Sequence, residues 1–142
     1  MKKLNEEQLK LLFEAAKQRQ KNAYVPYSHF KVGAAVLGSD GKIYKGCNIE
    51  NASFGLTNCA ERTAMFKMVS EGCQSFAALA VVAGETPGDS GPCGACRQVM
   101  SEFAENVNET PVYIFGTKGD YYRVPVIELY PRPFMKFEAN DK

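Results

Sequence analysis

The sequence predicts an α/β protein, a three-layer α-β-α sandwich built on a mixed sheet of about five strands. From residue 58 onward, helix-like segments alternate with short apolar runs. Strand–helix–strand units of this kind pair their strands in parallel and cover the sheet with helices. Earlier in the chain, two β-prone runs flank Ser39-Asp40-Gly41-Lys42, a turn with Asp-Gly chemistry. That pattern predicts a hairpin, which adds an antiparallel pair to the sheet.

The N-terminal third is expected to hold one helix and this hairpin. Asn5 is a suitable N-cap for a helix over residues 6–22. Pro26 favours an end to the helix before it, because the residue preceding a proline is disfavoured in the helical region. The hairpin strands are expected at 30–37 and 43–49. The apolar face of the helix has the spacing of an amphipathic helix and comprises Leu9, Leu12, Phe13 and Ala16.

The rest of the chain alternates helix and strand. The continuous apolar run at 77–83 is typical of a central strand with both faces covered. Three glycines and two prolines at 84–92 predict a loop. The other expected elements are helices at 58–71, 93–103 and 125–130 and strands at 112–115 and 121–124.

Length and composition limit the classes of function. The 142 residues suit a single domain over 1–142 with a substantial core. A formal net charge of +1 lacks the basic character of proteins that bind nucleic acid polymers. No apolar segment follows Lys2 and Lys3 to form a signal peptide, and no run is long enough to cross a membrane. The expected location is therefore the cytoplasm.

The chain has five cysteines, an odd number that argues against a disulfide framework. Cys93 and Cys96 form a Cys-x-x-Cys pair, which alone is compatible with a redox pair, half of a zinc ribbon, or coincidence. Cys47, Cys59 and Cys73 provide no second pair for a closed structural zinc site. A redox motif is expected early in a thioredoxin-like unit, whereas this pair lies late and follows a Pro/Gly loop.

Cys59 supplies a third ligand to the pair. All three cysteines lie at predicted helix starts, where the helix dipole lowers thiol pKa and favours the thiolate that binds zinc. Three ligands leave one tetrahedral position open, as in catalytic rather than structural sites. Glu61 follows Cys59 by two residues and can reach that position without binding the metal. Cys-x-Glu with Pro-Cys-x-x-Cys is the signature of zinc-dependent nucleobase deaminases, with the glutamate as acid and base.

Longer motifs extend this pattern over about residues 23–134. Together they resemble the small, homotetrameric cytidine deaminase family, whose members bind zinc and deaminate cytidine and 2′-deoxycytidine in pyrimidine salvage. The motifs that carry the resemblance are Pro26-Tyr27-Ser28-His29-Phe30, Val32-Gly33-Ala34-Ala35, Gly46-Cys47-Asn48-Ile49-Glu50-Asn51-Ala52, Cys59-Ala60-Glu61-Arg62-Thr63-Ala64, Pro92-Cys93-Gly94-Ala95-Cys96-Arg97-Gln98 and Glu128-Leu129-Tyr130-Pro131.

The resemblance implies a role for each matching position. One Zn²⁺ per subunit would be held by Cys59, Cys93 and Cys96, and Glu61 would move protons. Asn48 and Glu50 would bind the ribose 3′-hydroxyl, while Phe30 packs against the base and backbone groups near Ala60 and Gly91 read its amide edge. Phe134 would close the pocket of a neighbouring subunit, so that the homotetramer shares its active sites.

The charge of the proposed site suggests a role for one more residue, and two positions differ from the pattern of the family. Three thiolates leave the site net negative, and Arg62 can donate hydrogen bonds that offset this charge. Gly91 stands where relatives usually have Ser or Thr, and Phe54 where many have Tyr. His29, the single histidine, is expected to be a turn residue, because three cysteines already suffice for the metal.

Three other functions remain as alternatives. A polynucleotide editor on the same fold needs a basic groove with stacking aromatics, which the near-zero net charge opposes. A deaminase for a nucleoside antibiotic is closer, but Asn48 and Glu50 favour a ribose. A non-enzymatic zinc module would need neither an open ligand position nor Glu61.

Overall fold

A five-stranded mixed sheet forms the centre of the protein. The computed structural model describes residues 1–87 and 91–135. The strands lie in the order β2-β1-β3-β4-β5; β1 is antiparallel to both of its neighbours, β3 and β4 are parallel, and β5 is antiparallel to β4. The strands are β1 (Gly33–Gly38), β2 (Ile43–Cys47), β3 (Phe76–Val82), β4 (Pro111–Phe115) and β5 (Tyr121–Pro125).

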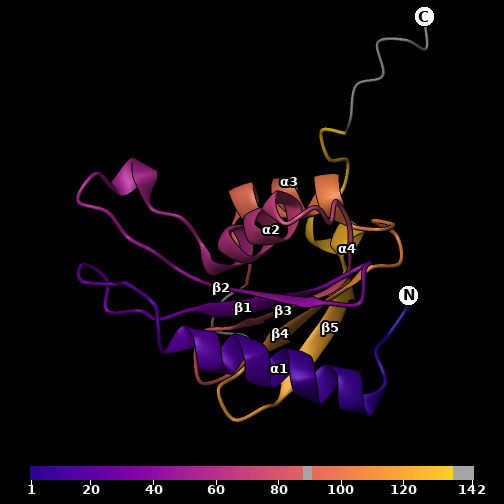
Figure 1. Ribbon diagram of the computed structural model, residues 1–142, viewed down its shortest axis with the longest axis horizontal. Coiled ribbons are helices and arrows are strands. Elements are labelled where there is room, and N and C mark those ends of the chain that lie inside the picture. The colour runs from indigo at the N-terminus through magenta and orange to yellow at the C-terminus, as the bar shows by residue number, and fades with distance from the viewer. Residues whose placement is uncertain (88–90, 136–142) are drawn as a thin grey trace, which may run out of the picture.

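Helices cover both faces of this sheet. Helix α1 (Glu6–Gln20) lies alone on one face, and α2 (Ala60–Ser70), α3 (Gly94–Phe103) and the short α4 (Val126–Leu129) lie on the other (Figure 1). The predicted three-layer sandwich with a mixed five-stranded sheet is confirmed. Each predicted helix and strand is present, with ends that differ from the prediction by a few residues. The 3-10 turn Phe54–Leu56 was not expected, and residues 88–90 of the predicted 84–92 loop lie outside the described residues.

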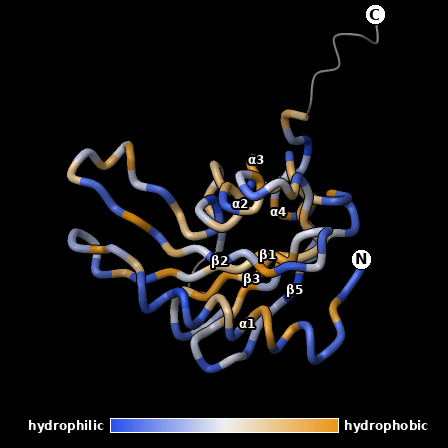
Figure 2. Tube along the Cα trace, viewed as in Figure 1, coloured by the Kyte–Doolittle hydropathy of each residue, from blue (hydrophilic) through white to orange (hydrophobic). Residues whose placement is uncertain are grey.

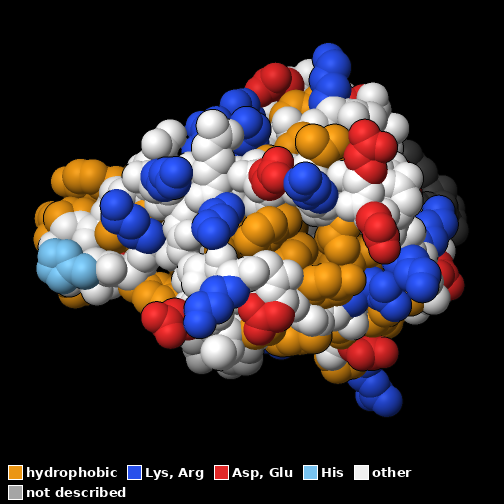
Figure 3. Space-filling view, turned by 90° about the horizontal axis from the view of Figure 1, so that it is seen from below, with side chains coloured by type: hydrophobic (Ala, Val, Ile, Leu, Met, Phe, Trp, Pro, Cys, Tyr) orange, Lys and Arg blue, Asp and Glu red, His pale blue; other side chains and the backbone are white. Residues whose placement is uncertain are grey.

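The sheet separates two apolar cores, and the trace around its central strand β3 is largely hydrophobic (Figure 2). Under α1, Leu12 and Ala16 pack on the sheet face that carries Tyr113 and Phe115. The core under α2 and α3 includes Met65, Met68, Phe76, Leu79, Met100 and Ile114. On the α1 side of the surface, Lys and Arg side chains intermingle with Asp and Glu (Figure 3).

Helix α1 begins where the sequence predicts. The Asn5 side chain accepts a hydrogen bond from the Gln8 backbone at 2.8 Å, and the Gln8 side chain accepts one from the Asn5 backbone at 3.2 Å, which together form a capping box. The helix lies so close to β1 that a Cβ atom on Gly33 would be 2.0 Å from the Ala16 carbonyl oxygen. Glycine at this position therefore allows the α1 layer to pack on the sheet.

A second close approach sets the position of α2. A Cβ atom on Gly46 would lie 2.5 Å from the backbone nitrogen of Ala64 and 2.6 Å from the carbonyl oxygen of Ala60. Both distances are too short for real Cβ contacts, so only glycine lets β2 run directly against the first turns of α2. Because Cys59 and Glu61 lie at the start of this helix, Gly46 helps to determine where they stand.

Candidate active site

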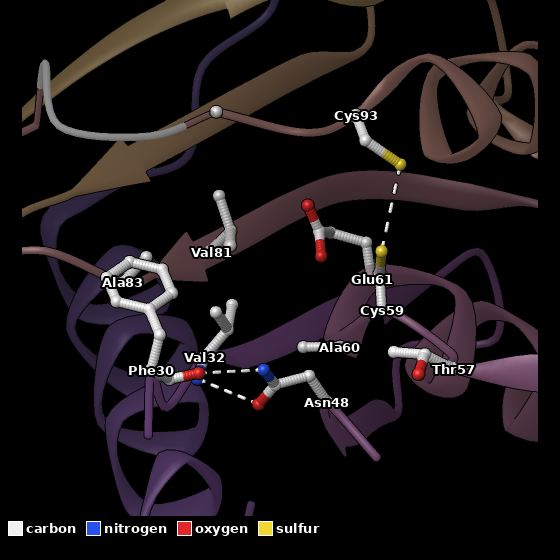
Figure 4. Close-up of a pocket in the computed structure, with 11 residues that line it drawn as sticks. Phe30, Val32, Asn48, Thr57, Cys59, Ala60, Glu61, Val81, Ala83 and Cys93 are labelled. Atoms are coloured by element: carbon white, nitrogen blue, oxygen red, sulfur yellow. Dashed lines mark hydrogen bonds between the residues drawn. The ribbon is translucent and has the colours of Figure 1, made fainter. Parts of the chain in front are cut away.

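Three cysteine side chains converge above the sheet. Cys59 is the N-cap of α2, Cys93 is the N-cap of α3, and Cys96 lies in the first turn of α3. Their sulfur atoms all lie within 4.8 Å of one another, and those of Cys59 and Cys93 are 3.7 Å apart (Figure 4). Cys96 is buried, Cys59 half-buried and Cys93 exposed, so the cluster is open on one side. The structure brings together the three residues that the sequence proposed as metal ligands.

The sulfurs also interact electrostatically. The pKa of the Cys59 thiol is lowered to about 5, mainly by a hydrogen bond with Cys96. Hydrogen bonds from Arg62 and Cys93 lower this pKa further, while burial acts in the opposite direction and raises it. The same hydrogen bond, together with burial, raises the pKa of Cys96. The Cys59 thiolate thus accepts a hydrogen bond from the Cys96 thiol. A soft divalent cation among the sulfurs would replace the shared proton, because thiolates are the preferred ligands of zinc. The donor set fits a zinc ion.

Arg62 lies one turn into α2 and faces the same cluster. Its Nη2 atom donates a hydrogen bond to the Cys59 sulfur at 3.3 Å. The hydrogen bond to the Cys59 thiolate is the main cause that raises the pKa of the guanidinium, so Arg62 stays protonated. The side chain is half-buried, which limits screening by water. Arg62 therefore supplies a fixed positive charge beside the thiolates.

Glu61 is the buried acid of the site. Its side chain is 4% exposed and lies beside the sulfurs of Cys59 and Cys93 (Figure 4). Burial, with a smaller contribution from the negative charge at Cys59, raises the pKa of Glu61 to about 7. A carboxyl group with this pKa can both accept and donate a proton near neutral pH, as general acid–base catalysis requires.

A cavity of about 160 Å³ adjoins Glu61 and two of the cysteines. Its wall combines residues from β3, the start of α2 and the loops around β1 and β2. Among the residues proposed from the sequence, Phe30, Asn48, Ala60 and Gly91 reach this wall. The sequence did not indicate four other lining residues, Val32, Thr57, Val81 and Ala83, because small or apolar side chains in strands and loops have no chemical signature.

Asn48 and Glu50 both make hydrogen bonds within the chain. The Asn48 side chain accepts from the Val32 backbone at 2.9 Å and donates to the Phe30 carbonyl at 2.8 Å (Figure 4). Glu50 accepts from the backbone of Tyr27 at 3.0 Å and of Ser28 at 3.1 Å, and from the Ser28 hydroxyl. These contacts hold the loop that carries Phe30, a role that the sequence did not reveal.

Glu50 lies outside the wall of the 160 Å³ cavity. It lines a neighbouring hollow of about 440 Å³ together with Tyr27, Ser28, Phe54 and Thr57. Thr57 borders both spaces, so the hollow and the cavity adjoin at this residue. The hydrogen bond from the Ser28 hydroxyl is the main cause that holds the pKa of Glu50 below its ordinary value, so Glu50 presents a carboxylate there.

Of the other proposed residues, Gly91 lies on the cavity wall and Phe134 does not. At Gly91, an added Cβ would meet Ile114, Tyr122 and Arg97 at 3.7–3.9 Å, which is ordinary contact. A Cβ atom therefore fits at this position without displacing its neighbours. Phe134 is 81% exposed and is not part of the cavity wall of its own chain.

A family model for the cytidine and deoxycytidylate deaminase zinc-binding region matches residues 6–113, which include all three cysteines and Glu61. The chain belongs to this deaminase family. Zinc is accordingly the metal for the three-cysteine donor set.

Individual relatives support the same assignment. The chain is 56% identical to a cytidine deaminase of Sporosarcina psychrophila, over 92% of this chain and 93% of that protein. It is 51% identical to a cytidine deaminase of Halalkalibacterium halodurans, over 92% of this chain and 97% of that one. The crystal structure of cytidine deaminase from Burkholderia pseudomallei superposes with a TM-score of 0.76 at 45% identity, covering 88% of this chain and 98% of that one.

Proposed function

We propose that this protein deaminates cytidine and 2′-deoxycytidine by zinc-dependent hydrolysis, releasing ammonia and the corresponding uridine nucleoside. The observation that carries the proposal is Glu61, a buried carboxyl group with a pKa near 7 on the wall of a cavity, beside a three-sulfur donor set. A closed structural zinc site has no use for such a group. We assign Cys59, Cys93 and Cys96 as the metal ligands and Glu61 as the catalytic acid and base.

Bound zinc supplies the Lewis acidity that makes a water molecule nucleophilic near neutral pH. Glu61 takes a proton from the attacking water as a C–O bond forms at C4 of cytosine, and delivers that proton to N3. Glu61 then moves a second proton from the new C4 hydroxyl group to the exocyclic amine, the C4–N bond breaks as the C4 carbonyl forms, and ammonia leaves. Arg62 offsets the negative charge that three thiolates place next to the reacting atoms.

The substrate is a free nucleoside. Phe30 packs against the base, and backbone groups at Ala60 and Gly91 read its amide edge. Asn48 and Glu50 bind the ribose 3′-hydroxyl while they hold the Phe30 loop. A carboxylate in that position suits a hydroxyl group and would repel the phosphate of a polynucleotide. The net charge of +1 also disfavours a polymer substrate.

We further propose a homotetramer whose active sites are shared between subunits. The cavity beside Glu61 is about 160 Å³, smaller than the ~300–1,000 Å³ typical of ligand pockets, so a nucleoside would extend beyond it toward the open hollow that Glu50 lines. Phe134 is exposed and aromatic, which suits a cap on a neighbour's pocket. Contiguous exposed apolar side chains are typical of protein interfaces, and the loops next to the site expose Tyr24, Tyr27, Phe30, Ile49, Phe54 and Leu56.

The proposed location is the cytoplasm, and the proposed physiological role is pyrimidine salvage. All five cysteines are free thiols in the structure, and a reducing compartment keeps such thiols available to zinc. In the part of the chain that is described, no helix has the length and apolar character needed to cross a membrane. The proposed organisation is one deaminase domain over residues 1–142.

One assay tests the proposed activity. Purified protein is analysed for zinc and then mixed with cytidine, 2′-deoxycytidine, dCMP or a cytosine-containing oligonucleotide, and ammonia is measured. We expect about one zinc per subunit and ammonia from the two nucleosides. Ammonia from the oligonucleotide alone would indicate a polynucleotide editor. If the zinc-loaded protein releases no ammonia from any of these substrates, the remaining interpretation is a non-enzymatic zinc-binding module.

A further inference from the structure

Arg97, in the second turn of α3, connects three segments of the chain. Its Nε atom donates a hydrogen bond to the Pro92 carbonyl at 2.7 Å, and its Nη1 atom donates one to the Leu129 carbonyl, also at 2.7 Å. Its own backbone nitrogen donates to the Cys93 carbonyl at 2.9 Å. One residue therefore binds the carbonyls of the two peptide groups that flank the Cα atom of Cys93, the atom that carries the sulfur-bearing side chain.

The second arm of Arg97 reaches α4. Leu129 is the last residue of this four-residue helix, where carbonyl groups lack partners within the helix. A guanidinium group is a planar fork of donors, which lets Arg97 bind two carbonyls that point at it from separate segments. The side chain is half-buried, and Pro92 is buried. In residues 1–87 and 91–135, the recorded salt bridge joins Met1 to Glu109 and does not involve Arg97.

The next residue, Gln98, holds the segment that follows α4. Its Nε2 atom donates a hydrogen bond to the carbonyl of Phe134 at 2.7 Å. Helix α3 thus carries two of the proposed metal ligands at its start and, one turn later, two side chains that bind the C-terminal segment. The two sets lie on the same short rigid element, so a shift of one shifts the other.

We infer that Arg97 and Gln98 are positioning residues, which fix the Cys93 loop and the Phe134 segment relative to each other from a single helix. The inference rests on the proposed function for the role of Phe134. Arg97 orients the peptide that precedes Cys93 and thereby sets where its sulfur stands with respect to Cys59. The third arm of the same guanidinium lies 3.9 Å from the Cβ position of Gly91, on the cavity wall. Arg97 therefore also packs beside the Gly91 backbone, which we assign to base recognition.

Arg97→Lys tests the first half of this inference. Lysine keeps the charge but presents a single ammonium group, which cannot hold two carbonyls in a forked geometry. We expect zinc affinity, measured by competition with a chromophoric chelator, to fall about 10-fold or more. The absorption of the cobalt-substituted protein should shift as the sulfur geometry changes, and KM for cytidine should rise more than kcat falls.

Arg123→Lys is the matched control, because Arg123 is equally half-buried but lies on β5 away from the cysteines. Zinc affinity and the cobalt spectrum should be unchanged in this variant. If Arg97→Lys and Arg123→Lys lower the melting temperature alike and neither changes zinc affinity, Arg97 is merely structural and the inference is wrong. The zinc and cobalt readouts need no turnover, so they remain decisive even if the proposed activity fails.

A double-mutant cycle tests the second half. Gln98→Ala should raise KM for cytidine in the wild-type background, because the Phe134 segment loses its anchor on α3. In the Phe134→Ala background the ring is already absent, so Gln98→Ala should add little to KM. Equal effects of Gln98→Ala in both backgrounds would show that Gln98 does not act through Phe134.

Discussion

The guanidinium of Arg62 donates a hydrogen bond to the Cys59 sulfur at 3.3 Å, within the first turns of one helix. The acceptor is a thiolate, and its charge raises the pKa of Arg62 in return. A cation built into the wall of the site reduces the negative charge that three thiolates would give to a zinc centre.

Arg62→Ala removes this charge and should lower kcat for cytidine while the three cysteines stay in place. Arg62→Gln should be less harmful, because its amide can still donate to the sulfur. Loss of an outer contact of this kind typically costs about 10–100-fold in activity or metal affinity. Steady-state kinetics and zinc content of both variants check the prediction, and unchanged values in both would mean that the charge compensation is unimportant.

Cys59→Ala, Cys93→Ala and Cys96→Ala should each lose zinc and activity, because two thiolates do not complete a tetrahedral site with an open position. Cys47→Ala is the control, since Cys47 is buried like Cys96 but lies outside the three-sulfur cluster. Elemental analysis and ammonia release provide the measurements. Chelation of the wild-type protein should abolish activity, and added zinc should restore it; full activity in excess chelator would exclude a catalytic zinc.

Glu61→Gln should keep zinc and the fold but lose about 10²–10⁴-fold in turnover, the usual contribution of general acid–base catalysis. The amide fills the same volume but cannot accept and return a proton. Zinc content should match the wild type, which separates lost proton transfer from lost metal. Turnover close to normal would place the proton carrier elsewhere.

The same substitution has an effect on stability that depends on pH. The pKa of Glu61 is about 7 in the folded chain and 4.5 ordinarily, so the folded state binds more protons than the unfolded state between these values. Unfolding free energy therefore falls as pH rises through this range, by up to about 3 kcal/mol in total. In the metal-free Glu61→Gln variant this fall in unfolding free energy does not occur, because glutamine does not ionise. The variant should be more stable than metal-free wild type at pH 8, and its advantage should vanish near pH 4.5, as measured by urea denaturation.

Gly46→Ala should displace α2, the helix that carries Cys59 and Glu61, from its position on β2. Its Cβ would overlap the backbone of Ala60 and Ala64, so α2 must move, at a cost typical of overpacking, about 1–3 kcal/mol. Zinc affinity should fall with stability, because Cys59 moves with the helix. Gly55→Ala is the control, since nothing lies within 4 Å of its added Cβ. A Gly46→Ala protein with wild-type stability and zinc affinity would contradict this account of the helix position.

Phe134 and Glu61 should complement each other between subunits. Phe134→Ala chains supply the acid but no cap, and Glu61→Gln chains supply the cap but no acid. Mixed oligomers contain some sites with both residues intact, so activity should rise when the two weak variants are refolded together. Native mass spectrometry verifies mixing. Mixed oligomers with only the parental activity would show that Phe134 does not act on a neighbouring subunit.

Much of the fold follows from local patterns in the sequence. The cap at Asn5 and the Asp40–Gly41 turn depend on interactions within a few residues, and β3 is marked by an unbroken apolar run, which is why their predicted positions match the structure. The short 3-10 turn Phe54–Leu56 was missed, because it lacks a side-chain cap and buries none of its residues.

For the site, the sequence by itself determined the reactive groups: three cysteines at helix starts, a glutamate two residues after one of them, and an arginine beside it. Only the tertiary structure decided how these groups meet. Cys59 and Cys93 are 34 positions apart, and their approach depends on sheet order and on the close packing of α2 on β2 at Gly46. The support from Arg97, Gln98 and Asn48 consists of side chains bound to backbone carbonyls of distant segments. Every residue has such a carbonyl, so no sequence pattern marks which one will be the partner.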